Sequence, residues 1–229
     1  KSAFIRNVTH ELRTPLTLIE GYLELLLTGQ MGPLLPQQQQ SLTVVAEKSA
    51  QLTHLVNDIV SLQAVGAMGF DFEVLSLVSL SEKAVAALRP KADKARIRFD
   101  LSLPPPEEPA VIEGDARRLY RVLIHLLENA IKFSPNGGTV RVAVESDRET
   151  IFVRVTDQGI GLPTAELERV FDRFYQVDGS STRRYSGIGL GLAHVKEVVE
   201  AHGGGVWAES QGSGQGSTFV CFFPAYEGE

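Results

Sequence analysis

The chain contains little of several things that would announce a function. It has 1 Cys, 1 Trp and 2 Met in 229 residues. A single thiol, Cys221, excludes an internal disulfide framework and fits a reducing compartment; its apolar neighbours predict a packed strand residue. No apolar run approaches the roughly 20 residues that a membrane-spanning helix needs. Acidic residues outnumber basic ones, and a net charge of −6 argues against nucleic-acid binding.

The start of the chain is also uninformative in one respect. Lys1 lies inside a helical pattern, with no capping residue before it, and no charged-then-apolar leader opens the sequence. We therefore expect a fragment of a longer protein. We expect this portion to be cytoplasmic, with membrane attachment only through a segment upstream of Lys1.

In the first third of the sequence, the spacing of apolar residues predicts two helices, each with one apolar stripe along its length. Apolar residues alternate at intervals of three and four from Ile5 to Leu26 and again from Leu42 to Ile59. A Gly- and Pro-containing turn at 28–33 separates them. A hairpin of this kind cannot bury a long apolar seam alone, so we expect a homodimer that forms a four-helix bundle.

The pattern changes after residue 67. We expect a hairpin domain over 1–67, a hinge or linker over 68–78, and a second domain over 79–229. In the second domain the periodicities predict interleaved helices and strands, which indicates an α/β sandwich. The predicted helices are 79–88, 115–133, 164–174 and 191–202, and the predicted strands are 96–103, 139–145, 151–157, 206–210 and 217–223.

One exposed histidine stands out in the first helix. With Ile5 at heptad position a, His10 falls at position f, opposite the seam. Its neutral imidazole is a competent nucleophile near pH 7. The carboxylate of Glu11 could orient the ring and accept its proton. Thr14 lies one helical turn further on, where its hydroxyl could orient a water.

Residues 4–17 read F-I-R-N-V-T-H-E-L-R-T-P-L-T and closely resemble the phospho-acceptor box of sensor histidine kinases. The resemblance implies that His10 is phosphorylated, that Glu11 is its acid/base partner, and that Thr14 serves a phosphatase reaction. The family usually has Ser where this chain has Thr9, which is a mild change.

Further segments resemble the ATP-binding half of the same family. Residues 126–134 resemble the box in which an asparagine, here Asn129, offers an oxygen to Mg²⁺ and a lysine, here Lys132, contacts phosphate. Residues 157–161 resemble the segment in which Asp157 accepts a hydrogen bond from the adenine amino group. Gly159 and Gly161 would allow the backbone close to the ligand.

Three more segments complete the resemblance. Residues 171–175 resemble the family's phenylalanine box, and residues 214–219, which include Thr218, resemble its last glycine box. The glycines at 187–191 open a helix, where amide groups suit a polyphosphate. Between these segments lies a Ser-, Gly- and Arg-rich stretch that we expect to be a lid, with Arg183 or Arg184 reaching the γ-phosphate. The implied nucleotide-binding glycines of this run are Gly187, Gly189 and Gly191.

One departure from the family pattern is informative. Many members carry a second asparagine one turn before the first, whereas this chain has His125. Its nitrogen could still serve the metal or the metal's waters. Related ATPases place a glutamate base there; Glu128 is about 100° round the helix from Asn129 and is expected to point elsewhere.

The resemblance covers nearly the whole chain. It implies a multidomain fold, in which an α-helical hairpin forming a dimeric four-helix bundle precedes an α/β sandwich ATP-binding domain of the histidine kinase type. It implies ATP and Mg²⁺ as cofactors, autophosphorylation of His10, and transfer to an aspartate on a response regulator receiver domain, with phosphatase activity toward that regulator. Two alternatives remain open: an ATPase that drives a conformational clamp, and a dimeric scaffold without turnover.

Overall fold

The computed structural model describes residues 2–67, 69–105, 110–147, 149–177 and 189–226. In the first two helices, the side chains of residues 2–11, 13, 47, 51, 54, 55 and 57–67 also lie outside the description. The chain divides into two compact units, Lys1–Met68 and Gly69–Glu229. Within the described part of the chain, no helix combines the length and apolar character that crossing a bilayer requires.

The first unit is a helical hairpin of α1 (Ser2–Leu27) and α2 (Pro36–Ala67). The Gly- and Pro-containing turn separates them as the sequence predicted, and Gly29 and Gly32 adopt positive φ values of 77° and 110° there. Pro15 lies inside α1 without ending it.

The face of α1 that the hairpin buries is not the predicted seam, since its buried residues are those that directly follow the seam positions Pro15 and Tyr22. Leu16 and Leu23 of α1 are buried, together with Ser49 and Val56 of α2. Seam residues of α1 and α2 remain exposed within the single chain: Leu12, Ile19, Tyr22, Val45 and Leu52. One apolar stripe therefore joins the two helices and a second is left on the surface of the hairpin.

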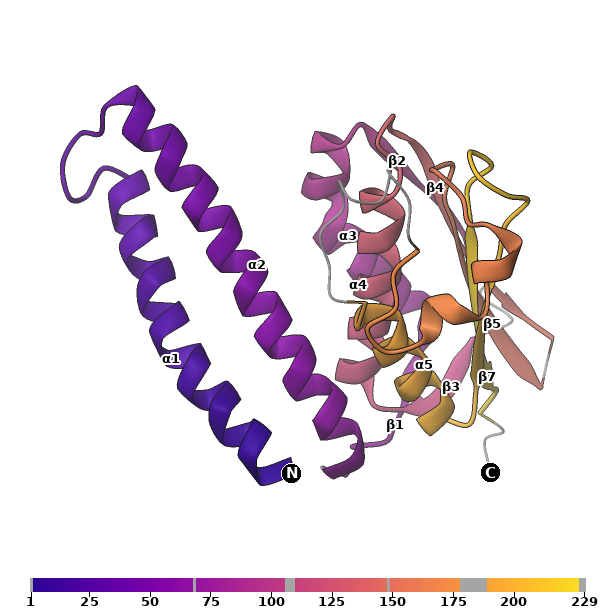
Figure 1. Ribbon diagram of the computed structural model, residues 1–229. Coiled ribbons are helices and arrows are strands. Elements are labelled where there is room, and N and C mark those ends of the chain that lie inside the picture. Colours follow the sequence, from indigo (N-terminus) through magenta and orange to yellow (C-terminus); the bar gives the residue numbers. More distant parts are fainter. Residues whose placement is uncertain (1, 68, 106–109, 148, 178–188, 227–229) are drawn as a thin grey trace. The chain divides into compact units, whose positions relative to one another are not determined.

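The second unit places a helical layer on a mixed five-stranded sheet with the order β2-β4-β5-β7-β6. Figure 1 shows a layer of helices lying against one face of this sheet. They are α3 (Leu77–Lys94), α4 (Ala116–Lys132) and α5 (Gly191–Ala201). The strands are β2 (Ile97–Ser102), β4 (Gly138–Ser146), β5 (Thr150–Thr156), β6 (Gly205–Glu209) and β7 (Thr218–Pro224).

The core between the sheet and the helices follows from alternation on the strands and a stripe on the helices. On β5, the buried residues Ile151, Val153 and Val155 alternate with less buried ones. On α4, residues at helical spacings such as Leu119, Leu126 and Ala130 are buried. The α/β sandwich predicted from the sequence is confirmed.

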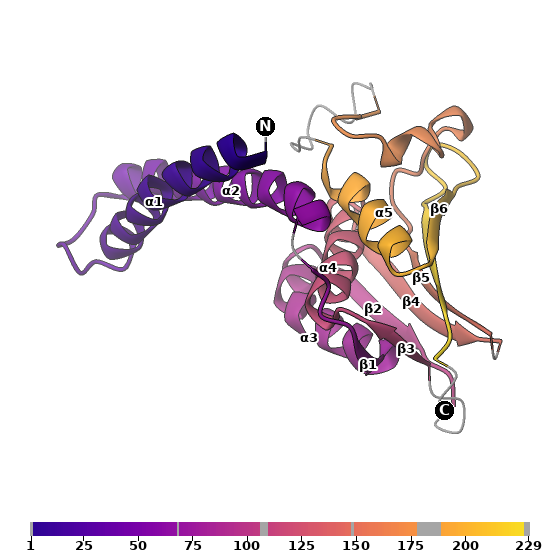
Figure 2. The ribbon, with the colours of Figure 1, turned by 90° about the horizontal axis from the view of Figure 1, so that it is seen from below.

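Two further short strands were not predicted. They are β1 (Glu73–Ser76) and β3 (Val111–Gly114), which pair antiparallel, side by side in Figure 2. Each has only four residues, too few for a period-2 pattern to stand out. β1 falls within 68–78, which we expected to be linker, and α3 begins at Leu77, so most of that stretch is regular structure of the second unit.

The single helix predicted over 164–174 is wrong. The structure has two short 3₁₀ turns, Thr164–Glu166 and Arg169–Phe171. Asp172 then takes an extended backbone, and Phe174 has a φ of 64°. A side-chain-bearing residue in the left-handed region is incompatible with continuing a right-handed helix.

Candidate functional site

A buried aspartate stands directly after β5. Asp157 is 5% exposed, and its Oδ1 accepts hydrogen bonds from the backbone N–H groups of Gly159 at 2.8 Å and Ser217 at 3.3 Å. Burial raises the pKa of this carboxyl group, and the two backbone hydrogen bonds oppose the shift. The carboxyl group is thus held in one orientation by its own loop and by the start of β7.

The glycines around Asp157 permit close packing of backbone on backbone. A Cβ on Gly159 would lie 2.1 Å from the Phe133 carbonyl oxygen, and one on Gly161, whose φ is 67°, would lie 2.1 Å from the Gly212 carbonyl oxygen. The backbone N–H of Ile160 donates to the Phe133 carbonyl oxygen at 3.0 Å. We expected these glycines to let the backbone approach a ligand; the close approach present in the structure is to neighbouring loops and to the end of α4.

Helix α4 carries the other polar residues of the predicted site on one side. Asp115 caps its start by accepting from the backbone N–H of Arg118 at 3.0 Å. Asn129 and Lys132 are half-buried near its end, and burial lowers the pKa of the Lys132 ammonium group. Because Phe133 bonds to the loop after Asp157, the end of α4 and the aspartate loop are one structural unit.

Glu128 forms an ion pair with α3, and its charge also acts on Lys132, whose pKa burial lowers and Glu128 raises. Its Oε1 lies 2.6 Å from the Nζ of Lys91 on α3. This ion pair is consistent with the expectation that Glu128 does not act as a base for hydrolytic water in the site.

His125 lies on α4 opposite a second histidine that the sequence reasoning did not single out. The ring centroids of His125 and His194, on α5, are 5.7 Å apart at an interplanar angle of 76°. A Cβ on Gly191, the first residue of α5, would lie 3.5 Å from Nδ1 of His125. The signal in the sequence was a histidine on the otherwise apolar stripe of α5, and it was missed because such a residue by itself suggests only core packing.

Gly189 packs closely against residues 171–175, the phenylalanine box. Its φ is 73°, and an added Cβ would lie 2.3 Å from the Tyr175 carbonyl oxygen. The Phe174 N–H donates to the Gly189 carbonyl oxygen at 2.9 Å. The structure therefore brings residues 171–175 to the start of α5. Three predicted lid and loop residues lie outside the described part of the chain: Arg183, Arg184 and Gly187.

Thr218, predicted from the last glycine box, lies at the start of β7. Its hydroxyl is 3.0 Å from the hydroxyl of Thr156 at the end of β5, and the two residues are register partners. Thr218 is thus adjacent to Ser217, which binds Asp157. The structure brings Asp157, Gly159 and Thr218 together where β5 ends and β7 begins, with Gly161 in the same loop as Gly159.

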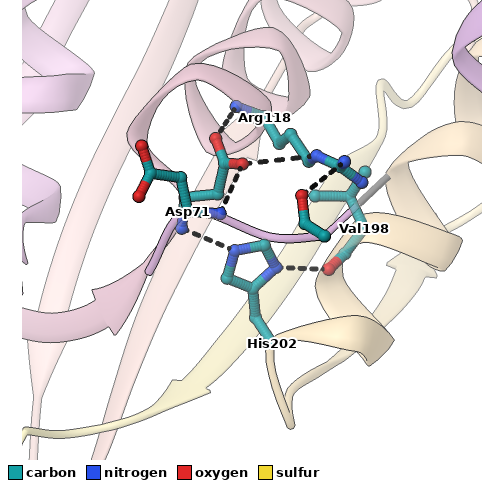
Figure 3. Close-up of polar contacts among 6 residues, drawn as sticks. Asp71, Arg118, Val198 and His202 are labelled. Atoms are coloured by element: carbon teal, nitrogen blue, oxygen red, sulfur yellow. Dashed lines mark hydrogen bonds and ion pairs between the residues drawn. The ribbon is translucent and has the colours of Figure 1, made fainter. Parts of the chain in front are cut away.

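A polar cluster lies where α4 begins and α5 ends (Figure 3). It binds the segment around Asp71, at the start of the second unit. His202 Nε2 accepts from the Asp115 N–H at 3.0 Å, and its Nδ1 lies 2.6 Å from the Val198 carbonyl oxygen. Arg118 forms an ion pair with Asp115 at 3.3 Å, and Asp115 Oδ2 also accepts from the Asp71 N–H at 3.4 Å. That segment is therefore bound to both helices that carry predicted site residues.

The phospho-acceptor candidates lie on the other unit. His10 and Glu11 occupy the middle of the N-terminal half of α1, and Thr14 follows one turn later with an exposed side chain. The side chains of His10 and Glu11 are outside the description. Thr17 and Glu24, which share heptad position f with His10, are exposed in the hairpin.

Comparison with known families gives two matches. Residues 1–67 match the His Kinase A (phospho-acceptor) domain, and residues 114–227 match the family described as histidine kinase-, DNA gyrase B-, and HSP90-like ATPase. One match lies in each unit of the chain, in the order that the sequence motifs predicted.

Individual relatives agree. The chain is 37% identical over 226 residues to the circadian input-output histidine kinase CikA of Synechococcus elongatus, covering 98% of this chain and 30% of that protein. It is 36% identical over 230 residues to the sensor histidine kinase WalK of Bacillus subtilis, covering 98% of this chain and 36% of that protein. The chain thus spans about a third of the length of these relatives.

Solved structures resemble the whole chain. Full-length ShkA in complex with AMPPNP has a TM-score of 0.79 and 26% identity, covering 100% of this chain and 47% of that one. The Acinetobacter baumannii histidine kinase AdeS has a TM-score of 0.65 and 26% identity, covering 95% of this chain and 98% of that one. Because both family models match and the relatives are sensor histidine kinases, we conclude that this chain belongs to the sensor histidine kinases of two-component systems.

Proposed function

We propose that this chain is a catalytic core that transfers the γ-phosphoryl group of ATP to His10 and then to an aspartate of a response regulator. The observation that carries the proposal is the construction of the second unit around Asp157. A buried carboxyl group is held by two backbone donors, and its loop is bonded to the end of the helix that carries Asn129 and Lys132. A nucleotide needs such an arrangement, with a fixed acceptor for its base and cationic groups for its phosphates.

The nucleotide assignment extends the same geometry. Asp157 would accept a hydrogen bond from the adenine amino group, and Thr218 would support that end of the pocket. Lys132 would contact phosphate oxygens. The glycines of the 187–191 run, Gly187, Gly189 and Gly191, would offer N–H groups to the phosphates. Arg183 or Arg184 would close over the γ-phosphate.

Mg²⁺ is the metal that fits this donor set. The ion prefers oxygen ligands, and the half-buried carboxamide of Asn129 offers one. The imidazole of His125 is a softer donor, better suited to the waters of the ion than to direct contact. When bound, Mg²⁺ would neutralise charge on the phosphate oxygens.

The phosphoryl transfer itself is a displacement at phosphorus. A ring nitrogen of His10 attacks the γ-phosphorus, the bond from that phosphorus to the bridging oxygen breaks, and ADP leaves with the electron pair. Glu11 is positioned in sequence to hold the ring and to accept its proton. Catalysis of this kind consists mainly of positioning and charge neutralisation.

Dimerisation is part of the proposal. Leu12, Ile19 and Tyr22 of α1 are each at least 46% exposed in the single hairpin, and such a stripe is normally covered. A second copy of the chain would bury it in a four-helix bundle.

A receiver domain is the partner that would take the phosphoryl group from His10. Thr14 would orient a water for the later removal of that group from the regulator.

Labelling with γ-³²P-ATP and Mg²⁺ tests the function. Label should appear on the protein, survive base, and be lost in acid, as a phosphoramidate is. His10→Gln should abolish it, and His54→Gln, a change to another histidine of the hairpin, should not. Steady phosphate release without labelled protein would favour the ATPase clamp, and failure to bind a fluorescent ATP analogue would favour the inert scaffold.

A further inference from the structure

His194 is a buried polar side chain on α5. It is 4% exposed, and among the described residues neither Nδ1 nor Nε2 has a hydrogen-bond partner. It lies on the buried stripe of α5 with Ala193, Val195 and Val198. Buried polar groups that no protein atom satisfies are costly and rare, and in many proteins a bound ion or water satisfies them.

The contrast with His202 shows that the fold can satisfy a buried histidine. His202 is 7% exposed, and its two ring nitrogens are engaged by the Asp115 N–H at 3.0 Å and the Val198 carbonyl oxygen at 2.6 Å. His194 lies on α5, about two turns before His202, which caps the end of that helix, and it has no comparable bonds to described residues. The ring nitrogens of His194 are therefore available to a bound ligand, because no described backbone group bonds to them.

The nearest candidate to share that ligand is His125. The two ring centroids are 5.7 Å apart and the rings are close to perpendicular. Two imidazoles that share one tetrahedral Zn²⁺, with Zn–N bonds of about 2.0–2.1 Å, have ring centroids roughly 5 Å apart. The absence of a side chain at Gly191, beside Nδ1 of His125, leaves room for small side-chain rotations.

The donor type defines the ion. Imidazole nitrogens suit Zn²⁺, Co²⁺, Ni²⁺ and Cu²⁺, whereas Mg²⁺ and Ca²⁺ prefer oxygen. No group of three or more His, Cys, Asp or Glu side chains in the described chain could hold a metal, so the pair would supply two ligands. The positive charges of Arg118 and Arg121 oppose further positive charge at His194, so the other positions of the ion suit an anion that offsets them.

We propose that His125 and His194 together form a two-imidazole site for a borderline divalent transition-metal ion between α4 and α5. The site shares His125 with the Mg²⁺ assignment, in which that imidazole serves only the waters of the ion, but His194 belongs to this site alone and binding does not require a nucleotide. The ion would then be held within the helical layer of the second unit, between α4 and α5.

Zn²⁺ competition against a chromogenic chelator, with metal-free protein and no nucleotide, tests the site. Wild type should bind Zn²⁺ saturably, and His125→Asn and His194→Leu should each weaken binding by at least about tenfold. His10→Gln should retain it, which excludes the phospho-acceptor as the source. Unchanged Zn²⁺ affinity in His194→Leu, or no saturable binding by wild type, would overturn the proposal.

Two further measurements separate this result from others. Co²⁺ bound by the wild type should show the intense visible absorption of a tetrahedral ion, and His194→Leu should lose that band; a wild-type spectrum of hydrated Co²⁺ alone would count against the site. The Mg²⁺-dependent binding of a fluorescent ATP analogue should persist in His194→Leu. Loss of Zn²⁺ binding with nucleotide binding intact would support the site independently of the proposed kinase function.

Discussion

Asp157 and Ser217 are joined by two hydrogen bonds. The Asp157 N–H donates to the Ser217 carbonyl oxygen at 2.8 Å, and the Ser217 N–H donates to Asp157 Oδ1 at 3.3 Å. One oxygen of the carboxyl group is therefore occupied by the protein, which fixes the plane of the group. A ligand can then be recognised by the other oxygen without the side chain having to reorient.

We expect Asp157→Asn to weaken nucleotide binding strongly. The amide can keep Oδ1 as an acceptor for the loop, but it presents an NH₂ donor toward the adenine amino group. Losing a hydrogen bond to a charged group costs about 1.5–3 kcal/mol, so the dissociation constant for a fluorescent ATP analogue should rise by roughly 10- to 150-fold. Asp100→Asn is the matched control, because that carboxylate pairs with Arg141 on the sheet; equal losses in both variants would contradict the assignment.

Gly161→Ala should destabilise the second unit more than Gly214→Ala does. Both glycines have positive φ, 67° and 80°, but only Gly161 has an atom in the way, the Gly212 carbonyl oxygen at 2.1 Å. The left-handed backbone alone costs about 1–2 kcal/mol, and the clash adds to it at Gly161. Chemical denaturation of the two variants measures the difference. A cost at Gly161 no larger than that at Gly214 would show that the loop can shift.

His194→Leu should raise the free energy of unfolding of the metal-free protein. The change removes two buried nitrogens without described partners and keeps a side chain of similar volume. Protein substitutions of this kind are worth about 1–3 kcal/mol, measurable by urea denaturation in the presence of a chelator. A clear loss of stability would mean that the imidazole makes compensating bonds.

The stability of the second unit should fall as the pH drops below neutrality, in part through His202. Burial lowers the pKa of this imidazole below 6.5, although the Val198 carbonyl and Asp115 oppose the shift. The unfolded chain then binds the proton more tightly, so stability that is present above pH 6.5 is lost as the pH falls through the lowered pKa.

The contribution of His202 is measured by comparing His194→Leu with the double variant that also carries His202→Gln. His194 is removed from both proteins because burial likewise lowers its pKa, to about 4. In that background, His202→Gln should be less stable at pH 7.5, because a bond to Asp115 or Val198 is weakened, yet should lose less stability between pH 7 and pH 5. Thermal melts across this range measure both effects. Parallel pH profiles for the two proteins would assign the pH dependence elsewhere.

Ile19→Glu and Leu52→Glu should convert dimers into monomers. These residues are 46% and 49% exposed in the single hairpin, and a charge at a buried helix interface leaves an unpaired group there. Analytical ultracentrifugation at micromolar concentration measures the change, with Gln40→Glu on the exposed surface of α2 as the control. Dimers that survive both substitutions would require a different interface.

Local patterns predicted most of the elements correctly. Helix α4 could be read because a capping aspartate precedes it and apolar residues recur at helical spacing. The strands of the large sheet alternate clearly, as on β5. Strands β1 and β3 could not be read, since they are four residues each and are stabilised by partners about forty positions away in the chain.

The site residues likewise include some that motifs predicted and others that only the fold revealed. Asp157, Asn129 and Lys132 could be singled out from motifs, and the structure ties the first to the helix of the other two through Phe133. His194 and the cluster of Asp115, Arg118 and His202 (Figure 3) could not, because their importance depends on which side chains meet across α4 and α5.

The sequence by itself determined the family, the order of the two units and the residue types that carry the chemistry, because these depend on short motifs and on local periodicity. Only the tertiary structure decided which partners surround each group. It showed that the glycines near Asp157 serve backbone packing and that Glu128 pairs with Lys91. It also left one buried histidine facing another. Such contacts join residues distant in the chain, and their energies depend on burial and geometry that no local pattern encodes.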